Sequence, residues 1–333
     1  MAMKRVELDL GKYEPKLVSP GVGVWQYEKP LPLTTDGHLR LIALGVGAGF
    51  SNKMRQSNFI IVKGQTALFV DLGAKATMRL AEFGRSVHDI EHILITHSHA
   101  DHTGSLEELA LKKRYEAPFL KLPKQPGESD AEYMKRIVRA QNRGQFRPAL
   151  YIGDEYVHEL WEDVLRGGLM VTEKTNIGLA DFFKIKKPRE ITRKNPDGWE
   201  YWNVGNIRVA SFFNKHAPEG NIRSHFHYPY TVGLVIDGRI FISGDTRFDL
   251  SLINEFGQNC EMLLHDCQHY PGGVHANFNE LKTLPAEIRR RMYLYHLSDG
   301  MLNIDVKADG FASRLEAAPI VYDFDPITNS NEA

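Results

Sequence analysis

Residues 93–102 read Ile93-Leu94-Ile95-Thr96-His97-Ser98-His99-Ala100-Asp101-His102, a short apolar run followed by three histidines and an aspartate. An uninterrupted apolar run is typical of a strand that is buried on both faces. The polar side chains that follow would need partners if they were buried, so we expect them on a loop after the strand. The capping-box pattern of Ser105 and Glu108 predicts a helix that begins there and runs through Leu111. The loop would therefore be held between a buried strand and a helix.

The residue types in this loop favour metal binding. Neutral imidazole nitrogens and carboxylate oxygens are good ligands for zinc and iron. His97 and His99 alternate in an extended segment and can point at one ion, while Asp101 and His102 follow a change of direction and can point at a second. One such histidine would more simply be a hydrogen-bonded loop residue. Four ligand-type residues within six positions favour a metal site instead.

The motif His97-x-His99-x-Asp101-His102 resembles the signature of the metallo-β-lactamase fold hydrolases. Two later stretches, Ser243–Thr246 and His296–Ser298, resemble that family's bridging aspartate and its last histidine ligand, and they follow in the same order. The resemblance covers residues 40–300. It implies an α/β fold, a four-layer αβ/βα sandwich, in which the ligands lie at one edge where the strands of both sheets end.

The resemblance also implies two divalent metal ions bridged by Asp245, which would hold a hydroxide between them. The first ion would take His97, His99 and one further histidine, and the second would take Asp101, His102 and His296. Three histidines remain candidates for the open position, in the order His227, His216 and His225. His227 is preferred because it precedes Gly233 at the family's spacing, whereas His216 is favoured if the loop after it is an insertion. Zinc is the first expectation, with manganese and iron as alternatives because two ligands are carboxylates.

Within this family the sequence looks most similar to the branch that holds tRNase Z and related small phosphodiesterases. His275 precedes His296 by 21 residues, as that branch's second histidine does, and Asp266 occupies the position of its acidic motif. The resemblance implies catalytic roles for Asp101, His275 and Asp266, with His275 as the general acid that protonates a leaving alkoxide. Asp266 stands where the branch has glutamate, and we find no Gly-Pro-rich arm of the kind that grips tRNA. Nucleic acid is therefore not favoured as a substrate.

We therefore expect a phosphodiesterase that acts on a small or nucleotide-like phosphodiester. A hydrolase of an ester, thioester, lactone or lactam fits the metal motif equally well, but it leaves His275 and Asp266 without a task. A diiron redox protein of the same fold is a further alternative, although nothing resembles an attached flavin domain. A scaffold with an inactive site is disfavoured because the ligand set is intact.

The rest of the chain favours one soluble domain over residues 1–333. The net charge of −1 gives no general attraction to nucleic acid, and we find neither a secretory signal nor an apolar run near membrane-spanning length. Two cysteines without such a signal predict reduced thiols and a cytoplasmic protein with no membrane partner. A homodimer is left open. Residues 112–147 look like a basic insertion, either a lid over the site that binds an anion or a solvated surface.

Several further elements follow from local patterns. A glycine turn at 45–49 is followed by a strand at 57–62, which argues against dinucleotide binding. Asp71, at the end of the next strand, is expected to anchor the metal loop, or else to be a simple turn residue. The turn Asp237-Gly238 predicts a hairpin over 231–242. Helices are expected over 130–141 behind Ser129, over 155–165 with an end at Gly167-Gly168, and over 279–292.

Overall fold

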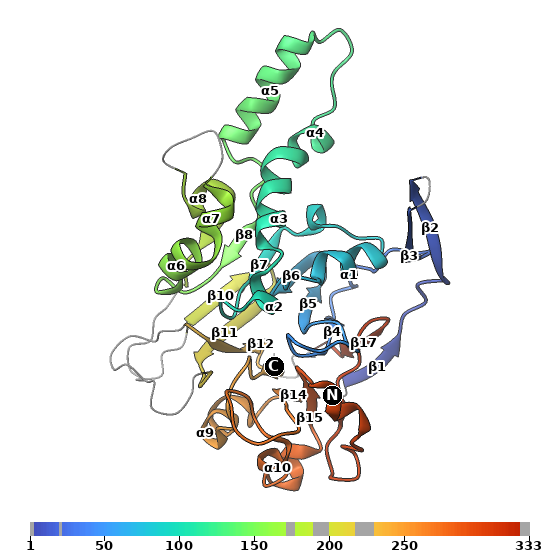
Figure 1. Ribbon diagram of the computed structural model, residues 1–333, viewed down its shortest axis with the longest axis vertical. Helices are drawn as coiled ribbons and strands as arrows, with labels where there is room; N and C mark the ends of the chain where they lie inside the picture. The colour runs from blue at the N-terminus through green and yellow to red at the C-terminus, as the bar shows by residue number, and fades with distance from the viewer. Residues whose placement is uncertain (1–2, 20–21, 171–176, 189–199, 217–229, 327–333) are drawn as a thin grey trace, which may run out of the picture.

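The computed structural model describes residues 3–19, 22–170, 177–188, 200–216 and 230–326, and two large sheets form its centre (Figure 1). Among the described residues the first sheet has eight strands, in the order β1 (Met3–Glu7), β17 (Ile320–Phe324), β4 (Leu39–Gly45), β5 (Asn58–Lys63), β6 (Thr66–Val70), β7 (His92–Leu94), β8 (Ala149–Tyr151) and β9 (Lys184–Lys186). The second has seven, in the order β10 (Glu200–Val204), β11 (Ile207–Phe213), β12 (Val232–Ile236), β13 (Ile240–Ile242), β14 (Met262–Asp266), β15 (Met292–Tyr295) and β16 (Ser313–Arg314). A separate hairpin, β2 (Tyr13–Ser19) with β3 (Val22–Tyr27), projects from the body.

Each sheet changes from antiparallel to parallel pairing partway across. Strands β6 to β9 are parallel in the first sheet, and strands β13 to β16 are parallel in the second. The carboxyl ends of parallel strands meet at one edge of a sheet, so the loops that follow β7, β13, β14 and β15 emerge together. This topology brings the ligand-type residues to one place.

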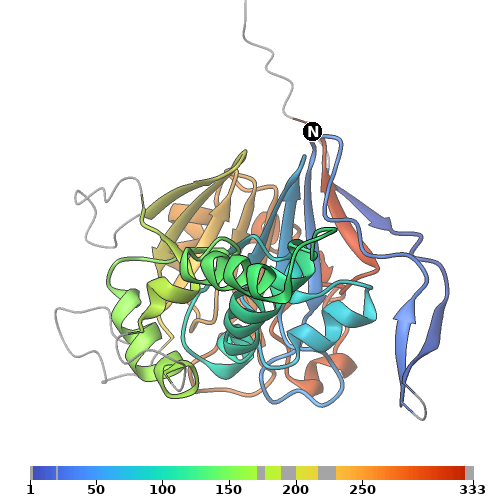
Figure 2. The same ribbon diagram turned by 90° about the horizontal axis from the view of Figure 1, so that it is seen from above.

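Helices lie outside the two sheets, and the order of layers is the predicted αβ/βα sandwich. The helices near the first sheet are α1 (Ala76–Glu82), α2 (Ala100–Thr103), α3 (Leu106–Leu111), α4 (Ala117–Lys121), α5 (Asp130–Asn142), α6 (Tyr156–Glu159), α7 (Arg166–Leu169) and α8 (Leu179–Phe182). The remaining helices are α9 (Leu250–Leu252), α10 (Phe278–Leu281) and α11 (Ala286–Arg289), of which α9 and α10 lie below the second sheet in Figure 1. Figure 2 shows the green helices gathered together over one face of the molecule.

The core between the sheets is continuous. Buried residues of the first sheet, such as Ile61 and Leu68, belong to one apolar cluster with Leu234 and Ile236 of the second. A second cluster joins the outer face of the second sheet to α9 and α10, with Phe241 as one of its members. Burial of this kind is the main favourable term in folding, and here both sheets contribute to it.

The predicted helix after the metal motif is confirmed as α3, with Ser105 at its N-cap position, although the short helix α2 precedes it and Ser105 Oγ donates to the carbonyl of Gly73 at 2.8 Å instead of capping α3. Two other predicted helices differ from the observed ones. The segment 155–165 continues as a π-helical turn into α7, past Gly167-Gly168. The segment 279–292 is broken into α10 and α11, because Pro285 cannot continue a helix.

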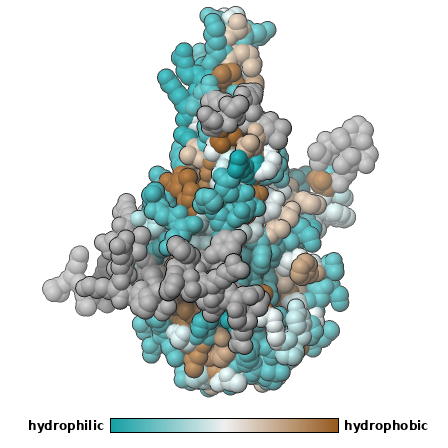
Figure 3. All heavy atoms as spheres, turned by 60° about the vertical axis from the view of Figure 1, so that its left-hand side comes forward, coloured by the Kyte–Doolittle hydropathy of each residue, from teal (hydrophilic) through white to brown (hydrophobic). Residues whose placement is uncertain are grey.

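Residues 112–147 form a projection from the rest of the described chain. They contain α4 and α5, which extend from the body at the top of Figure 1, and Ser129 caps α5 as predicted, in a capping box with Glu132. Much of the basic charge is paired, as in Lys113 with Glu91 at 2.9 Å and Arg136 with Glu128 at 2.7 Å. Figure 3 shows apolar patches on this projection. The paired charges favour the solvated-surface alternative.

None of the helices in the described residues is long and apolar enough to cross a bilayer. Cys260 and Cys267 are free thiols, both buried, and burial raises the pKa of Cys260 to about 12. The thiols are therefore neither paired with each other nor ionised at neutral pH.

Candidate active site

The ligand-type residues of the motif meet at the common edge of the two sheets. The loop after β7 carries His97 and His99, and the short helix α2 carries Asp101 and His102. His216 follows β11, Asp245 follows β13 and His296 follows β15. Segments far apart in the sequence therefore supply one compact cluster.

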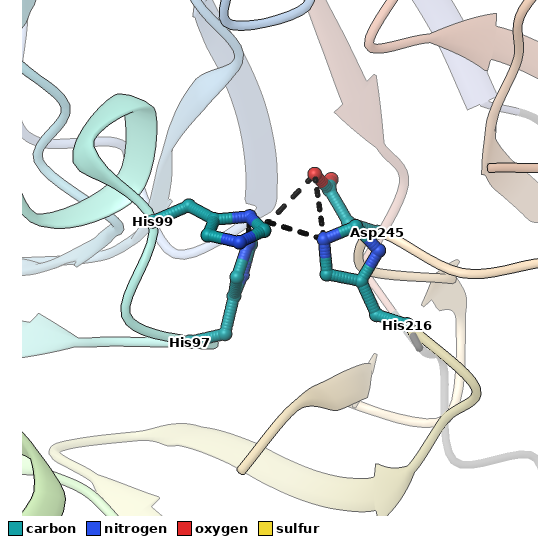
Figure 4. Close-up of side chains that lie close together, drawn as sticks. All are labelled: His97, His99, His216 and Asp245. Atoms are coloured by element: carbon teal, nitrogen blue, oxygen red, sulfur yellow. Dashed lines mark hydrogen bonds and ion pairs between the residues drawn. The ribbon is translucent and has the colours of Figure 1, made fainter. Parts of the chain in front are cut away.

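The first group of ligand atoms consists of three histidines and an aspartate: His97, His99, His216 and Asp245. The Nδ1 atom of His99 lies 3.1 Å from Nε2 of His97 and 3.1 Å from Nε2 of His216. Asp245 Oδ2 lies 3.8 Å from His97 Nε2. Figure 4 shows these side chains pointing toward a common centre.

The second group shares Asp245 with the first and adds Asp101, His102 and His296. Asp245 Oδ2 lies 3.4 Å from His102 Nε2 and 3.1 Å from His296 Nε2. Asp101 Oδ2 lies 3.4 Å and 3.1 Å from the same two nitrogens. A single oxygen of Asp245 therefore faces both groups, which is the position of a bridging ligand.

These separations fit ions at the centre of each group. Ligands at zinc–nitrogen distances of 2.0–2.1 Å in a tetrahedron stand about 3.3 Å from one another. The separations between ligand atoms in the two groups run from 3.1 to 4.0 Å. In the described part of the chain, the buried atoms His102 Nε2 and Asp245 Oδ1 have no hydrogen-bond partner. Buried polar atoms are normally satisfied, so ligand atoms left without hydrogen bonds agree with a place for a cation.

The histidines of the first group are held in the neutral form that a ligand needs. Burial lowers the pKa of His97 well below its usual value and lowers the pKa of His216 to about 4. His216 Nδ1 lies 3.1 Å from the carbonyl oxygen of Val274, to which it donates, so Nε2 is left with a free lone pair toward the centre.

Asp71 anchors the loop, as the sequence suggested. Its carboxylate accepts from the amide and the hydroxyl of Thr96, both at 2.8 Å, and lies 2.7 Å from Nδ1 of His102. A carboxylate on the second nitrogen of a ligating histidine fixes the orientation of the ring and raises its basicity. A residue that served only the turn would not make these contacts with Thr96 and His102.

His275 and Asp266 form a pair beside the second group. Asp266 is fully buried, and its Oδ2 lies 2.9 Å from His275 Nδ1. Burial disfavours the imidazolium form of His275, but the hydrogen bond and the charge of Asp266 outweigh it and raise the pKa of His275 to about 9. The ring of His275 stacks on that of His296, with centroids 4.8 Å apart. An imidazole whose pKa is raised by a buried carboxylate therefore stands next to the candidate metal site.

A third set of ligand-type atoms includes this pair: Asp245, Asp266, His275 and His296. The geometry thus leaves two roles for His275, proton donor or ligand. The hydrogen bond to Asp266 occupies Nδ1, so only Nε2 is left for either role.

A buried polar network holds the motif from the other side, and the sequence analysis missed it. Glu159 in α6 accepts from Ser98 Oγ at 2.5 Å and from the amide of Tyr230 at 3.1 Å. Tyr230 in turn donates its hydroxyl to Glu200 at 2.9 Å. Ser98 stands between the ligands His97 and His99. Glu159 therefore connects the metal loop to the second sheet.

The site opens into a cavity of about 690 Å³. It is lined by members of both groups, including His99, Asp101 and His296, and by His275. A neighbouring cavity of about 490 Å³ shares His275 and Gly273 with the first and is also lined by Lys215 and Arg247. No described residue of 112–147 lines either cavity. The cavities of a single chain therefore give no support to the lid alternative for this segment.

The preferred third histidine of the sequence analysis, His227, lies outside the described residues, as does His225. The second candidate, His216, lies within them and occupies the first group. Of the catalytic candidates, Asp101 and His275 line the cavity, and Asp266 lies buried behind His275.

Comparison with known proteins identifies relatives along most of the chain. The sequence profile of the family described as Anti-Pycsar protein Apyc1 matches residues 39–124 and 132–319. The Anti-Pycsar protein Apyc1 of Paenibacillus sp. (strain J14) is 30% identical over 270 residues, covering 79% of this chain and 91% of the relative. That of Bacillus phage BSP38 is 28% identical over 263 residues, covering 78% and 88%. The matched profile includes residues 112–124 and 132–147 of the segment 112–147.

Solved structures confirm the metallo-β-lactamase fold. The metallo-β-lactamase fold protein YhfI from Bacillus subtilis superposes with a TM-score of 0.57 at 15% identity, covering 86% of this chain and 100% of that one. The short form of human tRNase Z superposes with a TM-score of 0.53 at 16% identity, covering 85% and 98%. A diphosphatase of the PhnP family gives a TM-score of 0.54 at 12% identity, covering 86% and 98%. The predicted fold and the resemblance to tRNase Z are both confirmed.

Proposed function

The chain belongs to the Anti-Pycsar protein Apyc1 family, and from this premise we propose that it is a metal-dependent hydrolase of a small or nucleotide-like phosphodiester. The observation that carries the proposal is the His275–Asp266 pair at 2.9 Å, beside a candidate two-metal site. Hydrolysis of a phosphodiester releases an alkoxide, which is a poor leaving group unless it is protonated.

We assign the ligands from the geometry. His97, His99 and His216 would hold one ion, Asp101, His102 and His296 the other, and Asp245 would bridge them. His216 takes the position for which the sequence had favoured His227. Two such ions, when bound, lower the pKa of a water molecule and neutralise charge on the phosphate. The metal is proposed to be zinc, since five of the seven ligands are imidazoles, with manganese and iron as alternatives.

The chain's own residues have three tasks in this proposal. Asp71 and Glu159 hold the two ends of the metal loop, so the ligands stay in place without rearrangement. His275 protonates the leaving oxygen from Nε2, because Nδ1 is engaged with Asp266. Asp266 keeps that imidazole charged at neutral pH and fixes the direction of the ring.

A substrate comparison tests the proposal. Protein purified without chelator is assayed on bis(p-nitrophenyl) phosphate, on a lactone and on a β-lactam, before and after removal and return of zinc or manganese. We expect turnover of the phosphodiester that disappears with the metal and returns with it. Metal-dependent turnover of the lactone or the β-lactam, with no hydrolysis of the phosphodiester, would contradict the proposal.

A further inference from the structure

The carboxylate of Asp266 faces a second imidazole besides that of His275. His265, the residue before Asp266 in β14, is buried, and its Nδ1 lies 3.1 Å from Asp266 Oδ1. His275 meets the other oxygen of the carboxylate, Oδ2, at 2.9 Å. Two histidines therefore share one buried carboxylate, and of the two it is His275 that lines the cavity.

The contact between His265 and Asp266 does not follow from the strand alone. Successive side chains of a strand point to opposite faces of the sheet, so the side chains of these two neighbours should diverge. Instead, His265 Nδ1 lies 2.9 Å from the backbone carbonyl oxygen of Asp266 and also approaches its carboxylate. A carbonyl oxygen can only accept a hydrogen bond, so Nδ1 carries a proton. That N–H faces the carboxylate whether or not the ring is charged.

The oxygen Oδ1 of Asp266 depends on this neighbour. Oδ2 accepts from the amide of Thr246 at 3.1 Å in addition to its contact with His275. Oδ1 has no regular hydrogen-bond partner among the described residues, and Nδ1 of His265 is the donor that faces it. Burial would raise the pKa of Asp266, but the contacts with His265 and His275 lower it below its usual value. The carboxylate therefore stays ionised, with one imidazole at each oxygen.

We propose that His265 is a positioning residue, which acts through Asp266 to align the ring of His275. The inference rests on the proposed function, because it takes His275 as the proton donor. With a donor at each oxygen, the plane of the carboxylate is fixed and Oδ2 points at His275 Nδ1. Without His265 the carboxylate is free to turn about its Cβ–Cγ bond, so the direction of His275 Nε2 is no longer fixed. Proton transfer depends on that direction, since a misplacement of about 1 Å can cost on the order of 10²-fold in rate.

Two substrates with different leaving groups test this role in the metal-loaded full chain. His265→Phe and His265→Gln remove the donor at the position of Nδ1. The ratio of kcat on an alkyl phosphodiester to kcat on bis(p-nitrophenyl) phosphate should therefore fall about 10–100-fold. His265→Asn places an amide N–H close to the position of Nδ1, and it should keep the ratio of the unmodified chain. Metal content should be the same in all three variants, since His265 belongs to none of the ligand groups.

The NMR signal of the His275 Nδ1 proton gives a second measurement, which does not require turnover. In zinc-loaded protein with ¹⁵N-labelled histidine we expect a downfield signal for the proton between His275 and Asp266. This signal should shift or broaden in His265→Phe and His265→Gln, and it should be preserved in His265→Asn. His92→Phe is the control, because it removes another strand histidine, whose Nδ1 lies 3.0 Å from the Tyr151 hydroxyl. It should change neither the ratio nor the signal.

A ratio and a signal that stay unchanged in His265→Phe and His265→Gln would overturn the positioning role. Equal losses on the two substrates with an unchanged signal would also overturn it, because His265 would then only support the fold. If His265→Phe does not fold, the comparison of His265→Gln with His265→Asn, which differ by one methylene group, still decides the question. If the signal depends on His265 but the unmodified chain cleaves no phosphodiester, the proposed function fails while the positioning of His275 stands. If diesters are cleaved and neither measurement depends on His265, only the positioning role fails.

Discussion

His275 Nδ1 lies 2.9 Å from Oδ2 of Asp266, and that carboxylate has no exposed surface. Asp266 also accepts from the amide of Thr246 at 3.1 Å, so its position is fixed by the backbone next to Asp245. A buried carboxylate held in this way can only stabilise a charged imidazole, and the pKa of His275 is raised to about 9. A general acid must carry its proton at the working pH, and the raised pKa of His275 favours that condition.

The pair predicts a change in the pH profile. The kcat/KM for an alkyl phosphodiester should fall as the pH rises through the His275 pKa, because the deprotonated imidazole cannot donate. Asp266→Asn removes the charge that raises this pKa, so the falling limb should move to lower pH by about one to three units. Nearby dications shift the falling limb to lower pH in both proteins. The test is therefore the difference in the pH of this limb between the two profiles. A limb at the same pH in Asp266→Asn would contradict the role of Asp266.

The shared carboxylate predicts how the ions are lost. Asp245→Ala should release both ions together, since one oxygen faces both groups. His296→Ala removes a ligand of the second group only, and should leave about one ion per chain. Elemental analysis of dialysed protein measures the two ratios. One ion remaining in Asp245→Ala would make Asp245 a terminal ligand.

His216 is predicted to be the third histidine of the first ion. His216→Ala should weaken metal binding by more than the roughly 10–100-fold that loss of a supporting residue costs. His225→Ala and His227→Ala are the matched controls and should bind metal like the unmodified chain. Competition with a chromogenic chelator measures the affinities. A larger loss of metal affinity in His227→Ala than in His216→Ala would identify His227 as the third histidine ligand instead.

Glu159 is predicted to position the metal loop without touching an ion. Glu159→Gln breaks the charge-assisted bond from Ser98 and should weaken metal binding about 10–100-fold, with kcat partly restored by excess zinc. Glu162→Gln, a neighbour whose carboxylate instead pairs with Arg166, is the control and should be neutral. A merely structural role would lower thermal stability without changing metal affinity, and that result would contradict the prediction.

The sequence predicted the site residues that follow strand ends, for a physical reason. Side chains after parallel strands meet at one sheet edge, so the residues after β7, β13 and β15 could be placed together from the motif alone. His216 could not be ranked first, because ligand spacing does not encode the length of the chain between β11 and β12. The break in the helix at Pro285 could have been predicted from the sequence, because proline cannot continue a helix.

Contacts between distant segments could not be predicted from any short stretch of the sequence. β17 pairs with β4 across more than 270 positions of sequence, and nothing near either strand indicates that partner. Glu159 and Ser98 are 61 residues apart. The hint available was an acidic residue one helical turn from Tyr156 and adjacent to Leu160, on the apolar face of the predicted helix. Such a buried acid needs a partner, but only the fold shows which one.

The most direct test of the proposed chemistry compares two leaving groups in His275→Ala. An alkoxide leaves only when it is protonated, so the variant should lose about 10²–10⁴-fold in kcat on an alkyl phosphodiester. p-Nitrophenolate leaves without a proton, so the variant should retain most of its activity on bis(p-nitrophenyl) phosphate, with its metal content unchanged. Equal losses on both substrates together with a lost ion would show that His275 is a ligand. Unchanged turnover of both esters would contradict the assignment of His275 as the general acid.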